Sequence, residues 1–362
     1  MGLDDHRKRI DELDDQILKL LDERARVVSD IARSKRDANI PTYDPERERQ
    51  VLDRLAARAD RFPAEAIRAV YREIMSASLA LQEPIKVAYL GPEGTFSHAA
   101  ARAFFGLAAK YQEATTFDGV FDAVSRNQAA FGIVPVENSS DGAVPHAIDA
   151  LVGGDLLIRA ELDLEVSQCL LGRTSGLASI ERVYSKAEAL GQCRLWLAKN
   201  LGGAQLVQAP STTAAVREAM TDPQGAAIAS QLASELYGIP VMRERIQDRA
   251  ENFTRFVVVS HEDAARTGND KTTLAFSLRD GHGRGALMRA LAVFDDEGLS
   301  LTRIESRPSR EKSWDYVFLV DVLGHREDAH VAQAFGRLQE SCPLVKHLGS
   351  YPRVSRSRTT PP

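Results

Sequence analysis

The stretch "KVAYLGPEGTFSHAA", residues 86–100, divides the chain into two kinds of sequence pattern. It begins with a short apolar run, passes two glycines and enters a helix near Ser97. Before this stretch apolar residues recur at helical spacing, and after it short apolar runs alternate with helical segments. This order predicts an all-helical domain followed by an α/β region that starts at Lys86.

The composition is that of an ordinary globular protein. Of the 362 residues, 44% are hydrophobic and 27% are charged, and we expect two or three domains at this length. The net charge of −5 argues against a nucleic-acid partner. No apolar run approaches the roughly 20 residues that span a bilayer, so no membrane partner is expected. The start "MGLDDHRKRI" lacks the apolar core of a signal peptide, which predicts a cytoplasmic protein.

The cysteine pattern points to core residues. Cys169, Cys193 and Cys342 are scattered along the chain and odd in number. Their spacing fits neither a disulfide framework nor a zinc site, so we expect reduced side chains and no metal.

Residues 1–84 are assigned to one all-α domain. A stripe at a spacing of three and four residues predicts a first helix over residues 5–38, and it comprises Ile10, Leu13, Ile17, Leu20, Val27 and Ile31. Asp44 is expected to cap a second helix, with Pro45 at its first position. A third helix is predicted from Pro63 to Gln82, where the following Pro84 ends it.

Residues 86–262 are assigned to an α/β domain, because apolar runs predict strands there and helical segments separate them. The runs are "KVAYL", "FGIVPV", "DLLIRAELDL", "SQCLLG", "ERVYS", "AAIAS" and "TRFVVVS". The polar stretch "HEDAARTGNDK", residues 261–271, is predicted to be a linker.

Residues 271–350 are assigned to a third domain. Strand and helix patterns follow one another in the order βαββαβ, which is typical of a ferredoxin-like α+β unit. The strands are expected in "TTLAFSL", "LSLTRIESRP", "WDYVFLVDV" and "LVKHLGSY". The end of the chain, residues 351–362, is predicted to be a disordered tail.

Cations interrupt the apolar stripe of the first helix. Arg24 occupies a position that packing would fill with leucine, and a buried guanidinium needs an anion. Lys35 lies ~20° around the helix from Arg24 and ~16 Å along it, the reach of two long side chains around a small ligand. Arg7 is ~25 Å from Arg24 on a straight helix. It is therefore either a solvated charge or part of a partner chain's site, and surface charges on a helical bundle remain the alternative for all three.

The first 82 residues resemble the all-helical chorismate mutases that are fused to prephenate dehydratases. The matching residues are Arg7, Arg24, Lys35, Asp44, Arg47, Glu48, Ser78 and Gln82. The resemblance implies a pericyclic rearrangement of chorismate to prephenate, which needs no nucleophile, metal or cofactor. It also implies an intertwined helical dimer in which the first arginine completes the other subunit's site.

The resemblance assigns a role to each matched residue. Arg7 of the partner and Arg24 would hold the two substrate carboxylates, and Ser78 would contact one of them. Lys35 and Gln82 would donate hydrogen bonds to the ether oxygen, where negative charge develops. The ring hydroxyl would be held by Glu48 and the region of Asp44, which also acts as a helix cap, and Arg47 is counted among the substrate-binding residues.

Three hydroxyl-rich segments follow strands in the α/β domain. They are "YLGPEGTFSHAA", "VPVENSSDGAV" and "APSTTAAVREAM". Free amides and the helix dipole make a helix start a potential carboxylate site, although plain N-capping explains any one of them. Together they favour a cleft for a small acidic ligand. The glycine loop lacks a nucleotide-binding fingerprint, so no nucleotide is expected.

The same region resembles prephenate dehydratase over residues 86–262, through "GPEGTFS", "VPVENS", "STTAA" and "NFTRF". The resemblance implies two α/β lobes with an active site between them. It also implies conversion of prephenate to phenylpyruvate with loss of water and carbon dioxide, without a cofactor. Thr254 matches the essential threonine of the family, and Arg255 is a candidate partner for a carboxylate. The other implied substrate-binding residues are Ser97, Asn138, Ser139, Gln192, Ser211 and Thr212.

Two features of this region qualify the resemblance. Lys186 stands where the family often has histidine, and we assign it no role. In an extended strand Thr254 and Phe256 face one side and Arg255 faces the other. All three can contact one ligand only if the strand begins after Thr254.

The third domain resembles the ACT regulatory domain of these dehydratases. Two segments match its phenylalanine-binding motifs; they are Gly285-Ala286-Leu287 and Glu305-Ser306-Arg307-Pro308. The resemblance implies feedback inhibition by L-phenylalanine and an assembly of at least two chains. On the residues alone, Gly285 could merely start a helix and Pro308 end a strand.

The three resemblances cover essentially residues 1–350 and predict a bifunctional enzyme of phenylalanine biosynthesis. One alternative is a dehydratase whose mutase domain is inactive. Another is an amino-acid sensor whose α/β cleft binds a ligand without converting it.

Overall fold

The computed structural model describes residues 2–38, 43, 45–82, 84–278, 283–309 and 316–354. The chain forms two compact units. One comprises the residues up to Lys86 together with Arg102–Lys110, and the other comprises Val87–Ala101 and the residues from Tyr111 onward.

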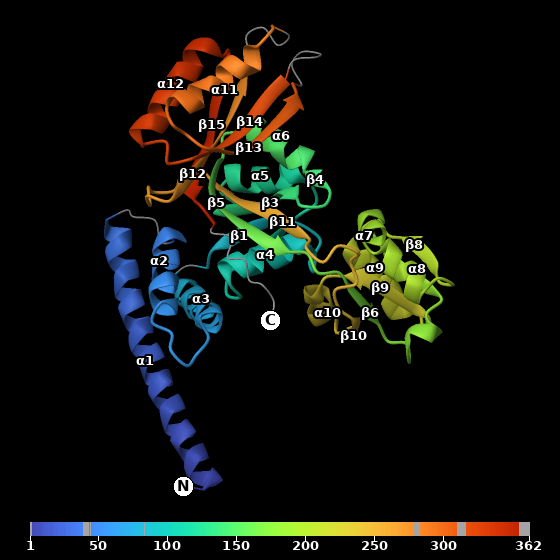
Figure 1. Ribbon diagram of the computed structural model, residues 1–362. Helices are drawn as coiled ribbons and strands as arrows, with labels where there is room; N and C mark the ends of the chain where they lie inside the picture. The colour runs from blue at the N-terminus through green and yellow to red at the C-terminus, as the bar shows by residue number, and fades with distance from the viewer. Residues whose placement is uncertain are drawn as a thin grey trace. The chain divides into compact units, whose positions relative to one another are not determined.

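The first unit is built on three helices, α1 (Leu3–Asp37), α2 (Pro45–Ala56) and α3 (Ala64–Ala80) (Figure 1). Helix α3 packs against α2 and also contacts α1. The predicted apolar stripe of α1 does not enter the core of the unit, because its six residues are 42% to 64% exposed. An apolar stripe of this length normally covers another helix. The predicted cap Asp44 lies outside the described residues.

The second unit begins with a sheet in the order β2-β1-β3-β11-β5, and β4 pairs with β3. Its strands are β1 (Lys86–Leu90), β2 (Lys110–Ala114), β3 (Phe131–Asn138), β4 (Gly142–Ala143), β5 (Leu157–Glu165) and β11 (Phe253–Ser260). Its helices are α4 (Phe96–Phe105), whose residues from Arg102 onward belong to the first unit, α5 (Phe117–Ser125) and α6 (Pro145–Gly153). Strand β11 lies between β3 and β5 and is antiparallel to both. The strand that carries "TRFVVVS" is thus a central strand with a buried apolar core.

A second sheet, in the order β10-β6-β9-β7-β8, forms another α/β lobe. Its strands are β6 (Cys169–Gly172), β7 (Arg182–Ser185), β8 (Gln205–Gln208), β9 (Gly225–Ala229) and β10 (Val241–Arg243). Its helices are α7 (Ala187–Gln192), α8 (Arg194–Asn200), α9 (Thr212–Thr221) and α10 (Gln231–Tyr237). The chain enters this lobe after β5 and leaves it before β11, so two connections join the lobes. The predicted two-lobed α/β domain is confirmed.

The third sheet has the order β13-β14-β12-β15. Its elements are β12 (Asp270–Ser277), α11 (Ala286–Asp296), β13 (Leu301–Pro308), β14 (Tyr316–Leu323), α12 (Ala329–Ser341) and β15 (Leu344–Pro352). This is the predicted βαββαβ unit, with both helices on one face of the sheet (Figure 1). The other face contributes Leu319, Leu348 and Tyr351 to the core of the first lobe.

Strands β15 and β5 approach each other closely. A Cβ atom on Gly349 would lie 2.2 Å from the backbone oxygen of Ile158, and Gly349 has a φ of +140°. Only glycine fits both requirements. The third domain is therefore packed onto the first lobe at backbone distance.

The structure corrects four details of the prediction. The segment that starts at Asn138 is a hairpin into β4, and the next helix, α6, begins only at Pro145. Strand β12 begins at Asp270, inside the predicted linker, and β15 extends to Pro352, inside the predicted tail. Helix α3 ends at Ala80, two residues before the predicted end. The short strands β2, β4, β8 and β10 carry too few apolar residues for their periodicity to be seen.

Candidate active sites

Helices α1 and α3 bring two of the predicted mutase residues together. Arg24 of α1 donates a hydrogen bond from Nη1 to Oγ of Ser78 on α3. The Ser78 hydroxyl in turn donates to the backbone oxygen of Ile74 at 2.6 Å. Lys35, eleven residues after Arg24 on α1, is half-buried. The guanidinium is thus held in place by a neutral hydroxyl, which leaves its charge for an anion.

Two further predicted mutase residues, Glu48 and Gln82, belong to the same helical unit. Burial raises the pKa of Glu48 to about 7, although a hydrogen bond from Tyr43 and the charge of Arg72 act in the opposite direction. The Oε1 atom of Gln82 is buried, and no hydrogen-bond partner for it occurs among the described residues. Tyr43 is only 7% exposed and was not predicted. A polar residue beside a carboxylate has no sequence signal of its own.

Two further predicted mutase residues, Arg7 and Arg47, are exposed. Arg7 is exposed and forms an ion pair of 3.5 Å with Asp4. Because α1 is one continuous helix, Arg7 and Arg24 are ~25 Å apart and cannot bind one small molecule within the same chain. Arg47 on α2 is exposed.

In the α/β domain, Thr254 and Asn138 lie opposite each other on β11 and β3. The Asn138 side chain donates from Nδ2 to Oγ1 of Thr254 at 2.8 Å. Its Oδ1 atom accepts from the backbone N–H groups of Ser140 at 2.8 Å and Asp141 at 3.1 Å. Backbone N–H groups can only donate, so they fix which end of the amide faces Thr254. The threonine oxygen is therefore the acceptor, and its own hydrogen is available for donation.

A network of amides connects this pair to the second lobe. Asn138 Nδ2 also donates to Oδ1 of Asn252 at 3.0 Å. Gln192 of α7 accepts at Oε1 from Asn252 at 3.3 Å and from Gln168 at 3.0 Å, and it donates to Asp141 at 2.8 Å. The structure thus brings together Thr254, Asn138 and Gln192. Asn252, Gln168 and Asp141 were not predicted; Asn252 alone had a signal, since it opens the "NFTRF" motif.

The glycine loop before α4 is bound to helix starts of the second lobe. Thr213 Oγ1 donates to the backbone oxygen of Glu93 at 2.6 Å, and Ser230 Oγ donates to that of Gly94 at 2.6 Å. Ser211 caps α9 by accepting from the N–H of Ala214 at 3.0 Å. These contacts join the two lobes at a second place.

The remaining predicted dehydratase hydroxyls differ in their surroundings. Ser97 lies in the first turn of α4 and is buried, and Thr212 is the first residue of α9 and half-buried. Ser139 Oγ accepts from the N–H of Phe253 at 3.0 Å, which fixes the start of β11. Lys186 precedes α7 and forms an exposed ion pair of 3.7 Å with Glu188.

Arg255 does not share a ligand with Thr254. Strand β11 begins at Phe253, before Thr254, so the two successive side chains project to opposite faces of the sheet. Arg255 is 9% exposed and donates to Glu161, Asp321 and Tyr351 at 2.8, 2.7 and 2.9 Å. The prediction of Arg255 as a carboxylate partner for the substrate is therefore wrong, because its donors are used on the far side of the strand.

The predicted effector motifs lie at the start of α11 and on strand β13. Gly285 precedes α11 with a φ of +74°, and the next two residues, Ala286 and Leu287, are half-buried. Glu305 is in contact with Arg303 of the same strand, whereas Arg307 forms an ion pair of 3.0 Å with Asp149 of α6. Ser306 and Pro308 project to the other face and are exposed, because β13 is an edge strand.

Within the described residues, no group of three or more His, Cys, Asp or Glu side chains could hold a metal ion. No helix in the described part of the chain is both long and apolar enough to span a membrane.

Comparison with known proteins matches all three domains. Residues 6–83 match the family chorismate mutase type II, residues 87–264 match prephenate dehydratase and residues 276–340 match the ACT domain. The bifunctional chorismate mutase/prephenate dehydratase of Aquifex aeolicus is 42% identical over 96% of this chain and 97% of its own length. That of Pseudomonas aeruginosa is 40% identical over 96% and 97%.

A solved structure agrees with these matches. The prephenate dehydratase from Arthrobacter aurescens, in complex with L-Phe, is 36% identical and superposes with a TM-score of 0.69. The superposition covers 74% of this chain and 90% of the other. The order of domains, the two-lobed α/β fold and the length of the matches agree in one conclusion. This chain belongs to the family of bifunctional chorismate mutase/prephenate dehydratases.

Proposed function

We propose that the chain converts chorismate to prephenate in its helical unit, and prephenate to phenylpyruvate at the Asn138–Thr254 pair. Family membership supports both activities. The observation that carries the second assignment is the fixed direction of the Asn138 amide. It leaves the Thr254 hydroxyl as a hydrogen-bond donor beside the connections between the two lobes.

The dehydratase reaction needs such a donor and little else. The ring C–O bond of prephenate breaks, and the bond to its ring carboxylate breaks as carbon dioxide leaves. The electron pair of that C–C bond enters the ring, which becomes aromatic, and the departing hydroxide takes up a proton to become water. Thr254 donates the hydrogen bond that assists this departure. The amides of Asn138 and Gln192 bind the substrate, together with the predicted hydroxyl residues, which are Ser97, Ser139, Ser211 and Thr212.

The mutase reaction is assigned to Arg24, Lys35, Glu48, Ser78 and Gln82. Cations and a hydroxyl suit the two carboxylates of chorismate, and the lysine and glutamine amide suit the negative charge that develops on the ether oxygen. Their action is electrostatic, and it restrains the substrate in a reactive conformation.

A second copy of the chain supplies Arg7 in this proposal. Its distance from Arg24 excludes a role in the same chain's site. The exposed apolar stripe of α1 supports an antiparallel pair of such helices, because burying it would remove six large side chains from water. Asp44 and Arg47 remain part of the proposed mutase site.

L-phenylalanine is the proposed effector of the third domain, at the motifs around Gly285 and Glu305.

The experiment that tests the proposal follows both products from one substrate. The purified protein is incubated with chorismate, and prephenate and phenylpyruvate are measured with and without L-phenylalanine. Both products are expected, with less phenylpyruvate when phenylalanine is present. Prephenate without phenylpyruvate would remove the dehydratase assignment, and an inert chain would favour an amino-acid sensor.

The mutase activity is expected to fall as the pH rises through about 7, because burial raises the pKa of Glu48 to about 7. Below that pH the neutral carboxyl can donate a hydrogen bond to the ring hydroxyl of chorismate. Above it, an anionic carboxylate faces a substrate with two negative charges, which is unfavourable. The measurement is the pH profile of kcat/KM for chorismate.

The matched variant is Glu48→Gln, which keeps the donor at every pH. It should retain activity and lose the fall near neutral pH. A profile that still falls in the glutamine variant would assign the pH dependence to another group.

Replacement of Glu305 by glutamine is expected to weaken phenylalanine inhibition at least about tenfold, because one charge-assisted contact to the ammonium group would be lost. Prephenate turnover without the effector should persist. The measurement is the concentration of phenylalanine that halves the rate. Glu327→Gln, at an exposed carboxylate of the same domain, is the control. Unchanged inhibition in the Glu305 variant would contradict the effector site.

A further inference from the structure

Next to the proposed dehydratase pair lies a second pair of residues, on the opposite face of the sheet. It consists of Arg255, which follows Thr254, and Glu137, which precedes Asn138. Thr254 is paired with Asn138 across β11 and β3, and Arg255 is paired with Glu137. Since successive residues of a strand face opposite sides, Arg255 and Glu137 lie on the face away from the proposed site. Their charges are 3.9 Å apart, from Nη1 of Arg255 to Oε2 of Glu137.

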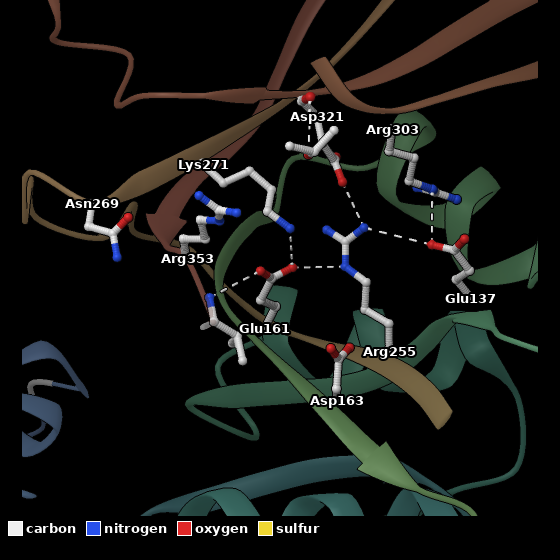
Figure 2. A pocket seen from close by; sticks show the side chains of 11 residues that line it. Glu137, Glu161, Asp163, Arg255, Asn269, Lys271, Arg303, Asp321 and Arg353 are labelled. Atoms are coloured by element: carbon white, nitrogen blue, oxygen red, sulfur yellow. Dashed lines mark hydrogen bonds and ion pairs between the residues drawn. The ribbon is translucent and has the colours of Figure 1, made fainter. Parts of the chain in front are cut away.

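The third domain supplies one counter-charge for each of these residues, as Figure 2 shows, and Glu161 of β5 is a further partner of Arg255. Arg255 Nη1 lies 2.7 Å from Oδ2 of Asp321 on β14, and Glu137 Oε2 lies 3.3 Å from Nε of Arg303 on β13. Asp321 and Arg303 are themselves partners across β14 and β13. We name Glu137, Arg255, Asp321 and Arg303 the charge quartet. It lines a cavity of about 670 Å³ between the dehydratase sheet and the sheet of the third domain.

The buried members of the quartet are held tightly. Asp321 is 1% exposed, and its other oxygen accepts from Thr273 Oγ1 at 2.7 Å. Arg255 uses Nε, Nη1 and Nη2 for three different partners, so its planar guanidinium has one orientation. A buried ion pair is costly to break, because the remaining charge stays out of water. The backbone of β11 is therefore fixed at the residue next to Thr254.

Positioning at this level matters for the chemistry. A hydrogen bond to a departing group weakens steeply with misalignment, and a displacement of about 1 Å at a reacting group can cost 10²-fold in rate. On the basis of the proposed dehydratase function, we infer that Asp321 and Arg303 of the third domain are positioning residues for Thr254 and Asn138. The third domain thus helps to hold Thr254 and Asn138 in position from the opposite face of the sheet.

The quartet also reaches the predicted effector strand. Arg303 contacts Glu305 as well as Glu137, and both contacts are made by one guanidinium. On this inference, a ligand that binds Glu305 at the proposed effector site takes one partner from Arg303, which also pairs with Glu137, the residue beside Asn138. This gives the third domain a direct electrostatic route to the proposed site.

The test compares two isosteric variants of the full-length protein. Asp321→Asn removes the charge that faces Arg255, which retains Glu161 and Tyr351 as partners. Asp149→Asn is the matched control, because it removes an anion of α6 that pairs with Arg307 of β13 and is no member of the charge quartet. The first variant is expected to lower the dehydratase kcat by about 10- to 100-fold with KM nearly unchanged. The control and the mutase activity of both variants are expected to stay near the parent values.

Equal loss in the two variants would mean general loosening of the third domain and would overturn the inference. Full dehydratase activity in Asp321→Asn would overturn it as well.

Amide hydrogen exchange at residues 254–256 supplies a readout that does not depend on activity. Exchange there is expected to be faster in Asp321→Asn and unchanged in Asp149→Asn, and equal rates would contradict the positioning role. If the parent protein converts no prephenate, the proposed function fails, and the exchange experiment still decides whether Asp321 holds β11.

Discussion

Replacing Thr254 with valine is expected to lower prephenate turnover by about 10²- to 10⁴-fold, the contribution of a placed proton or hydrogen-bond donor. Valine keeps the volume of the side chain and removes the hydroxyl. Asn138 would retain Asn252 as an acceptor, so the variant should fold. Because aromatisation drives the reaction, the enzyme contributes chiefly to the departure of the hydroxyl group. Loss of its donor should therefore appear mainly in kcat.

The measurement is steady-state conversion of prephenate to phenylpyruvate, with chorismate consumption of the same preparation as a test of folding. Thr254→Ser, which keeps a hydroxyl, is the matched control and should retain much more activity than the valine variant. If the valine variant works as well as the serine variant, Thr254 has no part in the mechanism.

Replacing Lys35 with alanine is expected to lower chorismate rearrangement by about 10²- to 10³-fold, the usual cost of removing one donor to a developing anion. Lys35 is half-buried near the C-terminal end of α1, on the same side of the helix as Arg24. Prephenate turnover should persist, because the proposed dehydratase site lies in the other compact unit. Arg33→Ala, at an exposed residue two positions earlier, is the control and should be nearly neutral. Intact rearrangement in the Lys35 variant would remove this residue from the site.

The same variant also tests the proposed exchange of Arg7 between chains. Arg7→Ala alone and Lys35→Ala alone should each be inactive as mutases. Mixed dimers have one site that lacks both residues and one intact site, so a random mixture should recover about a quarter of the parent activity. A mixture that stays inactive would argue against a shared site.

Much of the fold could be predicted from the sequence because its signals are local. Helix α1 and the strands of the third domain occur within about two residues of their predicted bounds, since periodic apolar residues specify them directly. The motif residues Thr254, Asn138 and Gln192 were singled out by resemblance, and the structure places them in one hydrogen-bond network. Short strands such as β8 were missed because its four residues are mostly exposed.

Other parts of the site required the tertiary structure. Gln168, Asn252 and Asp141 join the network through partners 24 to 114 residues away in sequence, and no local pattern marks such contacts. The face of the sheet on which the Arg255 side chain lies depended on the residue at which β11 begins. Once β11 begins at Phe253, the side chain after Thr254 must face the third domain.

By itself, the sequence determined three consecutive domains and most of their secondary structure, because periodic apolar residues lie along the chain, and its resemblance to known families indicated the motif residues. The tertiary structure decided which side chains face which. It set Thr254 against Asn138 on one side of the sheet and Arg255 against Asp321, 66 residues away, on the other. The physical reason is that strand pairing brings distant residues together, and a shift of one residue in that pairing reverses the face of every side chain.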